Sequence, residues 1–259
     1  MGYESIALKA VNHVGWLEYR KAPVNAVDPP MVLEIIAGLK QLSADPDVRV
    51  IVLASALEKY FCVGADLKVF DGITPEGMGH WASACHEMVF LVRQAPKPVL
   101  AAIHGTAVGG GLELTLHCDL RFAATDARLG QPEIDINFIP PVGATQALVR
   151  LLGRPGAIRY LYDGKLVSAQ DALRMGLVDA LHPPESLRAE VQAYAETLAQ
   201  KPPEALEAIR KSITEGMDLP FRDGLRIEKQ WVVRLAGTRN FREGVTAFLA
   251  KRKPKWSWE

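Results

Sequence analysis

The stretch His104-Gly105-Thr106-Ala107-Val108-Gly109-Gly110-Gly111-Leu112-Glu113 places three consecutive glycines between two regular segments. An apolar run, residues 98–103, precedes the glycines, and residues 112–116 have the apolar spacing of a helix. This pattern predicts a buried strand, a tight turn and the start of a helix, because glycine permits positive φ and close approach to the main chain. The first amides of a helix have no intrahelical partner, so they suit a developing negative charge.

Two glutamates accompany this turn. Glu113 falls in the first turn of the predicted helix, and Glu133 follows in Gly130-Gln131-Pro132-Glu133. Free amides for an oxyanion and two carboxylates for proton transfer form a coherent catalytic set. Each feature also has a plain structural explanation: a tight connection, a glutamate favoured by the helix dipole, and an exposed loop acid. The sequence has no Gly-x-Gly-x-x-Gly and no Walker-type loop, so a nucleotide site is not supported.

The composition is that of an ordinary globular protein. The 259 residues are 49% hydrophobic and 23% charged, enough for one large domain or one domain with an appendage. Lys plus Arg and Asp plus Glu number 30 each, so no overall basic field recruits nucleic acid or an anionic membrane. Three widely spaced cysteines and six scattered histidines predict reduced thiols and no metal site. Without a signal peptide or a membrane-length apolar run, we expect a soluble, cytoplasmic protein.

The N-terminal half reads as alternating strands and helices. The predicted elements are a hairpin, a helix, a buried strand, a second helix and a further strand, at residues 5–10 with 14–19, 31–42, 48–54, 80–94 and 99–104. Residues 72–79 read as a glycine-rich connection, either a plain loop or a mobile wall of a pocket. Strand, glycine turn and helix occur twice, over residues 48–70 and 98–118, which indicates a repeating superhelical unit.

After Glu133 the chain changes character. Residues 142–152, 155–162, 169–175, 184–200, 203–215, 220–235 and 241–251 read as helices, interrupted by a strand at 177–181. Lys201-Pro202-Pro203 is the best candidate for a boundary. Beyond it, the helices carry apolar stripes that require a partner surface.

Several segments follow one another along the chain in a characteristic order and spacing: Asn25-Ala26, Phe61-Cys62-Val63-Gly64-Ala65-Asp66-Leu67, Gly109 to Glu113 with Cys118-Asp119, Gly130 to Glu133, Asp163 to Val178, and Arg242 to Phe248. Together they resemble the crotonase (enoyl-CoA hydratase/isomerase) superfamily nearly end to end. The resemblance implies an α/β fold, a crotonase-like spiral of repeated ββα units with a C-terminal helical trimerisation region. We accordingly expect a spiral core with a CoA-ester site over residues 1–200 and a helical oligomerisation region over 201–259. The implied partner is a second copy of the chain, in a homotrimer or a dimer of trimers.

The resemblance also implies a chemistry, enoyl-CoA hydration. The amides of Val63 and Gly110 would hold the enolate-like oxyanion of an acyl thioester. Glu113 would activate a water for addition across the 2,3 double bond, and Glu133 would protonate Cα. Coenzyme A enters as part of the substrate, so we expect no separate cofactor. The residues assigned to holding the CoA ester are Ala65, Asp66, Leu67, Gly109 and Lys251.

The loop after Glu133 departs from the family pattern. Many members have a glycine-rich stretch there, whereas this chain has Asp135, Asn137, Pro141 and Ala144. The identity of the acyl group is therefore left open, and a cyclic or polar acyl group is among the alternatives. The alternative reactions on the same scaffold are double-bond isomerisation, ring-substrate hydration and decarboxylation. A third hypothesis is a non-enzymatic binder of protein or RNA. The basic, tryptophan-flanked tail at 251–258 favours it. Zero net charge makes nucleic acid an unfavoured partner.

Overall fold

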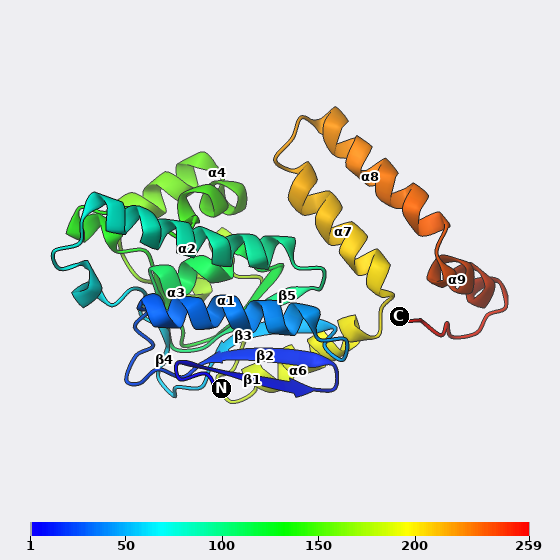
Figure 1. Ribbon diagram of the computed structural model, residues 1–259, viewed down its shortest axis with the longest axis horizontal. Coiled ribbons are helices and arrows are strands. Elements are labelled where there is room, and N and C mark those ends of the chain that lie inside the picture. Colours follow the sequence, from blue (N-terminus) through cyan, green and yellow to red (C-terminus); the bar gives the residue numbers. More distant parts are fainter. Residues whose placement is uncertain (1, 259) are drawn as a thin grey trace.

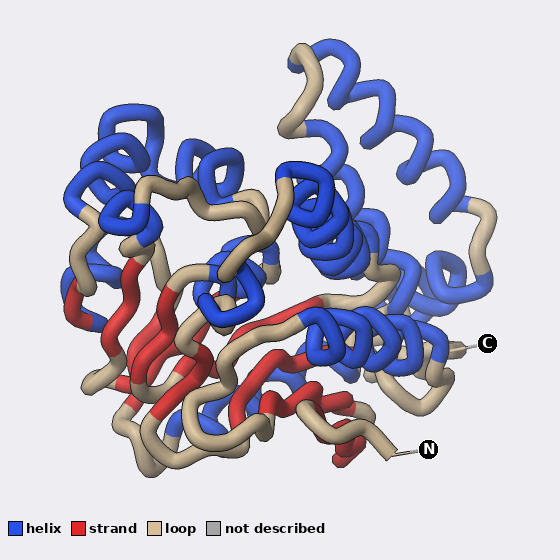
Figure 2. The backbone as a smooth tube through the Cα atoms, turned by 60° about the vertical axis from the view of Figure 1, so that its left-hand side comes forward, coloured by secondary structure: helices blue, strands red, loops and turns tan. Residues whose placement is uncertain are grey.

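The computed structural model describes residues 2–258, which form two β-sheets and the helices around them (Figures 1 and 2). The first sheet has the strand order β1-β2-β3-β5-β7-β10, and the second has the order β4-β6-β8-β9. The first sheet contains β1 (Ile6–Val11), β2 (Val14–Tyr19), β3 (Val50–Ser55), β5 (Val99–Ile103), β7 (Leu120–Ala124) and β10 (Ala180–His182). The second contains β4 (Tyr60–Cys62), β6 (Thr106–Val108), β8 (Arg128–Gly130) and β9 (Val167–Ser168).

The chain passes repeatedly from the first sheet to the second and returns through a helix. β3, β5 and β7 are parallel neighbours in the first sheet, and β4, β6 and β8 are parallel neighbours in the second. The return from β4 is α2 (Pro75–Gln94), and the return from β6 is α3 (Gly110–Glu113), continued by the 3-10 turn η2 (Leu114–His117). The predicted spiral of ββα units is confirmed, as is the antiparallel hairpin of β1 and β2.

Hydrophobic burial explains the centre of this spiral. Every residue of β3 and β5 is buried, as expected for strands covered on both faces. The helix α1 (Pro29–Ala44) buries one apolar face, and its first turn is capped by Asp28, whose side chain accepts the Met31 N–H at 3.1 Å.

Two predicted boundaries in the core were wrong. The connection at 72–79 is mostly helix, because Pro75 begins α2 and the Thr74 hydroxyl caps it by accepting the Gly77 N–H at 3.1 Å. That cap outweighs the low helix propensity of the glycines. The predicted strand at 177–181 is displaced to β10, because Leu177 and Val178 bury their side chains in the turn after α5 (Ala169–Met175).

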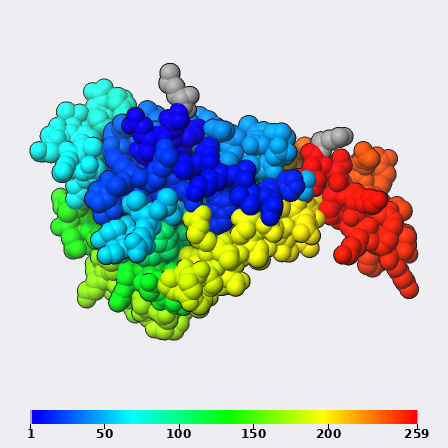
Figure 3. Space-filling view, turned by 90° about the horizontal axis from the view of Figure 1, so that it is seen from below, coloured from blue at the N-terminus to red at the C-terminus, as the bar shows by residue number. Residues whose placement is uncertain are grey.

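The C-terminal half is helical, as predicted. The helix α4 (Ala144–Asp163) joins the two expected helices across a kink at Gly153, where φ is 68°. It is followed by α5, α6 (Leu187–Ala199), α7 (Pro203–Gly216), α8 (Phe221–Ala236) and α9 (Arg239–Leu249). The proposed boundary falls between α6 and α7, and beyond it α7 to α9 extend away from the body of the molecule (Figures 1 and 3). None of the helices within residues 2–258 is long and apolar enough to cross a membrane.

Candidate active site

Most of the predicted site residues gather at one edge of the second sheet. The three parallel strands β4, β6 and β8 lie side by side, with Val108 opposite Gly130. Their carboxyl ends therefore meet at the same edge. The segments that leave them are residues 63–65, 109–110 and 131–133, which are three of the motifs singled out in the sequence. Parallel pairing thus brings together segments that are far apart along the chain.

The glycines of the central turn are required by how closely the neighbouring segments approach. Gly109 adopts φ 52° and ψ −135°, and a Cβ atom at this position would lie 2.8 Å from Glu133 Oε1. A Cβ at Gly111 would lie 2.5 Å from Cys62 Cβ. Any larger residue would push the turn away from Glu133 on one side or from Cys62 on the other. The glycines therefore allow three segments to meet at the start of α3.

The backbone amides of Gly110, the first residue of α3, and of Ala65 lie at this edge and have no acceptor among the described residues. Ala65 pairs with Val27 in an isolated parallel bridge, in which Val27 bonds to the flanking residues Gly64 and Asp66, so the Ala65 N–H points to the other side. The turns are adjacent, because a Cβ at Gly64 would lie 3.3 Å from the Gly110 nitrogen.

The amide of Val63 is engaged elsewhere. It donates to the Val24 carbonyl oxygen at 3.3 Å, so its N–H is not free for an oxyanion. This contact argues against the predicted role of Val63 as an oxyanion donor. Val63 lines the pocket, but its amide faces a neighbouring loop. The sequence motif is consistent with any of its amides, and only the pairing with Val24 and Val27 distinguishes them.

Glu113 is completely buried behind the glycine turn. Its Oε2 accepts the Val142 N–H at 2.7 Å and the Ala144 N–H at 3.2 Å, at the N-terminus of α4. Its Oε1 is buried without a partner among the described residues. Burial, followed by the nearby charge of Glu133, raises the pKa of Glu113 to about 8, although the two N–H groups oppose this shift.

Glu133 begins the short 3-10 turn η3 (Glu133–Ile136) and is 9% exposed. Burial raises its pKa to about 7. The side-chain amide of Gln131 lies against it and, in the orientation that satisfies its surroundings, donates to both carboxylate oxygens at 3.1 Å. The site thus contains two neighbouring carboxyl groups, both of which titrate close to neutral pH.

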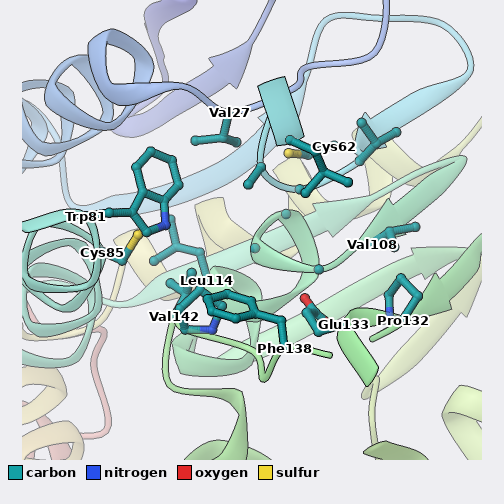
Figure 4. A pocket seen from close by; sticks show the side chains of 18 of the residues that line it. Val27, Cys62, Trp81, Cys85, Val108, Leu114, Pro132, Glu133, Phe138 and Val142 are labelled. Carbon is teal, nitrogen blue, oxygen red and sulfur yellow. The ribbon is translucent and has the colours of Figure 1, made fainter. Parts of the chain in front are cut away.

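A mostly apolar cavity of about 400 Å³ opens onto this edge (Figure 4). Glu133 and Pro132 lie on one side of it and Trp81 and Cys85 on another. Predicted site residues that line it are Val63, Ala65, Leu67, Gly109, Gly110 and Glu133. Glu113 lies just behind the wall, next to the lining residues Leu114 and Val142.

Sequence reasoning missed the far wall of the cavity. Trp81, Cys85 and Met88 of α2 line it. Phe70 also lines the cavity, and its ring centroid lies 5.4 Å from that of Trp81 and 6.0 Å from that of Phe138, a lining residue beside Glu133 (Figure 4). The spacing of residues 81, 85 and 88 is the signal that was available, since it places them on one helix face.

Two predicted ligand-binding residues lie outside the cavity. Asp66 caps the turn η1 (Leu67–Phe70), where its side chain accepts the Lys68 N–H at 3.1 Å. Lys251 follows α9 and is not among the lining residues. Asp135, by contrast, is an exposed residue that does line the cavity. Residues 2–258 contain no cluster of three or more His, Cys, Asp or Glu side chains that could hold a metal ion.

The comparisons with known proteins agree with this geometry. Residues 14–259 match the family model described as enoyl-CoA hydratase/isomerase. The chain is 34% identical to the (E)-benzylidenesuccinyl-CoA hydratase of Thauera aromatica, over 96% of this chain and 97% of that protein. It is 33% identical to the crotonyl-CoA hydratase of Syntrophomonas wolfei, over 98% of each. The crystal structure of an enoyl-CoA hydratase from Bacillus anthracis superimposes with a TM-score of 0.93 at 36% identity, covering 99% of this chain and 100% of that one.

The expected crotonase-like fold and the expectation of an enzyme resembling the enoyl-CoA hydratases are thereby confirmed. A match at this identity over 98% of the chain includes both the spiral and the helical region. The chain belongs to the enoyl-CoA hydratase/isomerase family.

Proposed function

We propose that this enzyme adds water reversibly across the 2,3 double bond of a 2-enoyl-CoA thioester. The observation that carries the proposal is that Glu113 and Glu133 lie beside the free Gly110 amide at the edge of an apolar cavity. The apolar cavity suits an acyl chain, and coenzyme A enters as part of the substrate. No separate cofactor is needed for the reaction.

The oxyanion of the thioester enolate is assigned to the amides of Ala65 and Gly110. Ala65 replaces Val63 in this role, because the Val63 N–H already donates to Val24. Both proposed donors are main-chain groups fixed before substrate arrives, so they need no reorganisation during the reaction. Each such donor typically contributes about 2.7–4 kcal/mol of transition-state stabilisation.

The two glutamates share one proton in this mechanism. The water proton passes to Glu113 as the hydroxyl adds at Cβ, and Glu133 gives its proton to Cα. The pair then still holds one proton, now on Glu113. Burial raises the pKa of both glutamates, which favours a pair that holds one proton near neutral pH. That proton returns from Glu113 to Glu133 before the next hydration.

The first test follows the absorbance of the conjugated enoyl-thioester band. Loss of the band with the wild-type enzyme is expected, and Glu113→Gln or Glu133→Gln should slow it by about 10²–10⁴-fold, the usual contribution of general acid–base catalysis. Unchanged circular dichroism spectra would show that both variants fold. Wild-type activity in both variants would overturn the mechanism.

A second assay separates the two roles. Exchange of the Cα proton of a saturated acyl-CoA with D₂O needs a base at Cα and the oxyanion amides, but no water addition. Under the proposed assignment, Glu113→Gln retains this exchange and Glu133→Gln loses it. The reverse result would exchange the two roles.

The acyl group is the open part of the substrate. The two hydratase relatives are named for very different acyl groups, benzylidenesuccinyl and crotonyl. The aromatic rings of Phe70, Trp81 and Phe138 that line the cavity favour a cyclic or aryl acyl group over a short linear one. Crotonyl-CoA, longer linear enoyl-CoAs and cinnamoyl-CoA, offered in turn, test this preference. Binding without loss of the band would favour isomerase or decarboxylase chemistry.

The same family membership supports assembly as a homotrimer or a dimer of trimers. The helices α8 and α9 expose large apolar side chains, among them Phe221 and Phe248 at 83% and 84%. An interface between copies would cover them and would bring Lys251 to the CoA phosphates of a neighbouring subunit. Analytical ultracentrifugation should find three or six copies, and Phe248→Asp should reduce that number. A monomeric wild-type protein would overturn the proposed assembly.

A cytoplasmic location remains a prediction.

A further inference from the structure

His117 ends the 3-10 turn η2, four residues after Glu113. Both residues belong to the continuous helical segment formed by α3 and η2. Both are buried, His117 at 8% exposure and Glu113 at 0%. They contact the same three-residue segment, 142–144, which leads into α4.

The contacts form a closed arrangement around Val142. The Val142 N–H donates to Glu113 Oε2 at 2.7 Å, and the Val142 carbonyl oxygen lies 2.9 Å from His117 Nε2. The Ala144 N–H donates to the same Glu113 oxygen at 3.2 Å. His117 thus contacts the carbonyl side of this segment, and Glu113 accepts hydrogen bonds from its N–H groups.

The protonation of His117 follows from its partner. A carbonyl oxygen only accepts, so Nε2 carries the proton, and Nδ1 is buried without a partner among the described residues. Burial, together with the charges of Arg93 on α2, Arg121 on β7 and Arg150 on α4, lowers the pKa of His117 to about 4, although the hydrogen bond to Val142 opposes this shift. The ring is therefore neutral and fixed as the Nε2–H tautomer near neutral pH.

Gly143 shows how closely the imidazole packs on the segment. Its φ is 84°, and a Cβ at this position would lie 2.9 Å from His117 Nε2 and 3.1 Å from Cε1. The ring therefore occupies the space that a side chain would need, and it restricts the backbone between the two N–H groups that contact Glu113. A displacement of the ring would be transmitted directly to both amides.

We propose that His117 is a positioning residue for Glu113. By holding the Val142 carbonyl and packing on Gly143, it keeps the amides of Val142 and Ala144 together on Oε2, so that Oε1 alone is left to exchange a proton with water. The proposal rests on the proposed function of Glu113 as a proton-transfer group. No metal, cofactor or second ligand enters it.

The test compares two substitutions of His117. Glutamine places an amide N–H near the position of Nε2 and is the conservative variant, whereas leucine fills the space without a donor. We expect His117→Leu to lower kcat by about tenfold to a hundredfold, the cost of a small misplacement of a catalytic group, with KM changed less than about twofold. His117→Gln should restore kcat to within about threefold of the wild type.

The pH profile separates positioning from a general loss of structure. The two N–H hydrogen bonds favour the ionised form of Glu113, so their loss in His117→Leu should raise its pKa and move the profile of kcat toward higher pH. Glu133 and the Cys85 thiol, the titratable groups that interact with Glu113, are unchanged in both variants. Gly143→Ala should move the pH profile of kcat in the same direction, because its Cβ would push on the His117 ring.

A wild-type kcat and pH profile in His117→Leu would overturn the proposal. So would an equal loss of activity and of melting temperature in the leucine and glutamine variants, since that pattern indicates a purely structural residue. If the wild-type enzyme hydrates no enoyl-CoA, the proposed function fails, but His117 is still testable. Infrared titration of ¹³C-labelled glutamate carboxyls, with Glu113→Gln to identify the band, should still show a higher pKa for Glu113 in His117→Leu.

Discussion

The spiral core and the helices beyond residue 201 bury their apolar residues in different ways. In β3 and β5 every residue is buried, whereas α8 has no buried residue. The core therefore satisfies its hydrophobic side chains within one copy of the chain. The helices α7 to α9 pair with one another and leave broad apolar faces exposed, among them Val232 and Val233 at 60% and 65%. The proposed catalytic site lies in the self-sufficient region, and the proposed association surface lies in the other.

Arg210 of α7 is the main buried link between the two regions. Its guanidinium donates to Asp119 at 2.8 Å and to the carbonyl oxygens of Arg93 and Ala95 at 2.8 Å, and it also contacts the Val92 carbonyl. These carbonyls lie at the C-terminal end of α2, where a cation is favoured by the helix dipole. One side chain thus couples the helical region to the helix that carries the far wall of the cavity.

The largest expected effect lies entirely within the core. Gly110→Pro removes a proposed oxyanion donor, and proline is well tolerated at the first position of a helix. We expect kcat to fall by about 10²–10³-fold, measured by the enoyl-thioester absorbance. Gly110→Ala is the matched control, because it keeps the amide and its Cβ would meet only Val142 Cγ2, at 3.4 Å. Equal activities of the two variants would exclude the Gly110 amide from catalysis.

The second prediction breaks the link between the regions. Arg210→Met should lower the free energy of unfolding by about 2–3 kcal/mol, because hydrogen bonds to a charged group are lost in a buried site. Urea denaturation measures this loss, and proteolysis near Lys201 should become faster as α7 loosens. Lys211→Met on the same helix is the control, since Lys211 pairs with Glu207 one turn away and lies 5.9 Å from the Trp231 ring centroid, both within the helical region. Equal stabilities of the two variants would contradict the role of Arg210.

The third prediction concerns the effect of burial in the core on the pKa values of the two glutamates. Burial raises the pKa of Glu133 to about 7 and that of Glu113 to about 8, and activity requires a pair that holds one proton. kcat/KM should therefore be bell-shaped, with its maximum between these values and about a tenfold fall per pH unit beyond them. A profile that stays flat from neutral pH down to about 5 would mean that the carboxyls titrate near their ordinary values.

The smallest expected effect concerns the tail. Trp258 lies under the Arg49 guanidinium, 4.1 Å from ring centroid to Cζ, and Asn240 fixes the neighbouring Ser257 through two hydrogen bonds of 2.8 Å. Trp258→Ala should lower the unfolding free energy by about 0.5–1 kcal/mol, and Trp258→Phe by less, because it keeps an aromatic face. Thermal unfolding measures both. A larger loss in the phenylalanine variant would rule out the cation–π contact as the cause.

The sequence predicted the local structure of the candidate site well where a motif carries local geometry. The glycine turn needs no tertiary information, because only glycine combines a φ of 52° with a ψ of −135° without strain, as Gly109 does, and Glu113 follows at a fixed helical spacing. Val63 shows the limit of this reasoning. Which amide of its segment is free depends on pairing with Val24 and Val27, which are distant along the chain. The motif has no signal for that choice.

By itself, the sequence determined the order of strands and helices, the glycine turn, the two glutamates and the apolar stripes of the last helices. These follow from side-chain periodicity and from glycine stereochemistry, which act over a few residues. Only the tertiary structure decided which groups share the site. The parallel pairing of β4, β6 and β8 brings Ala65, Gly110 and Glu133 to one edge. Burial there sets the pKa values of both glutamates, because desolvation depends on every element packed around a charge.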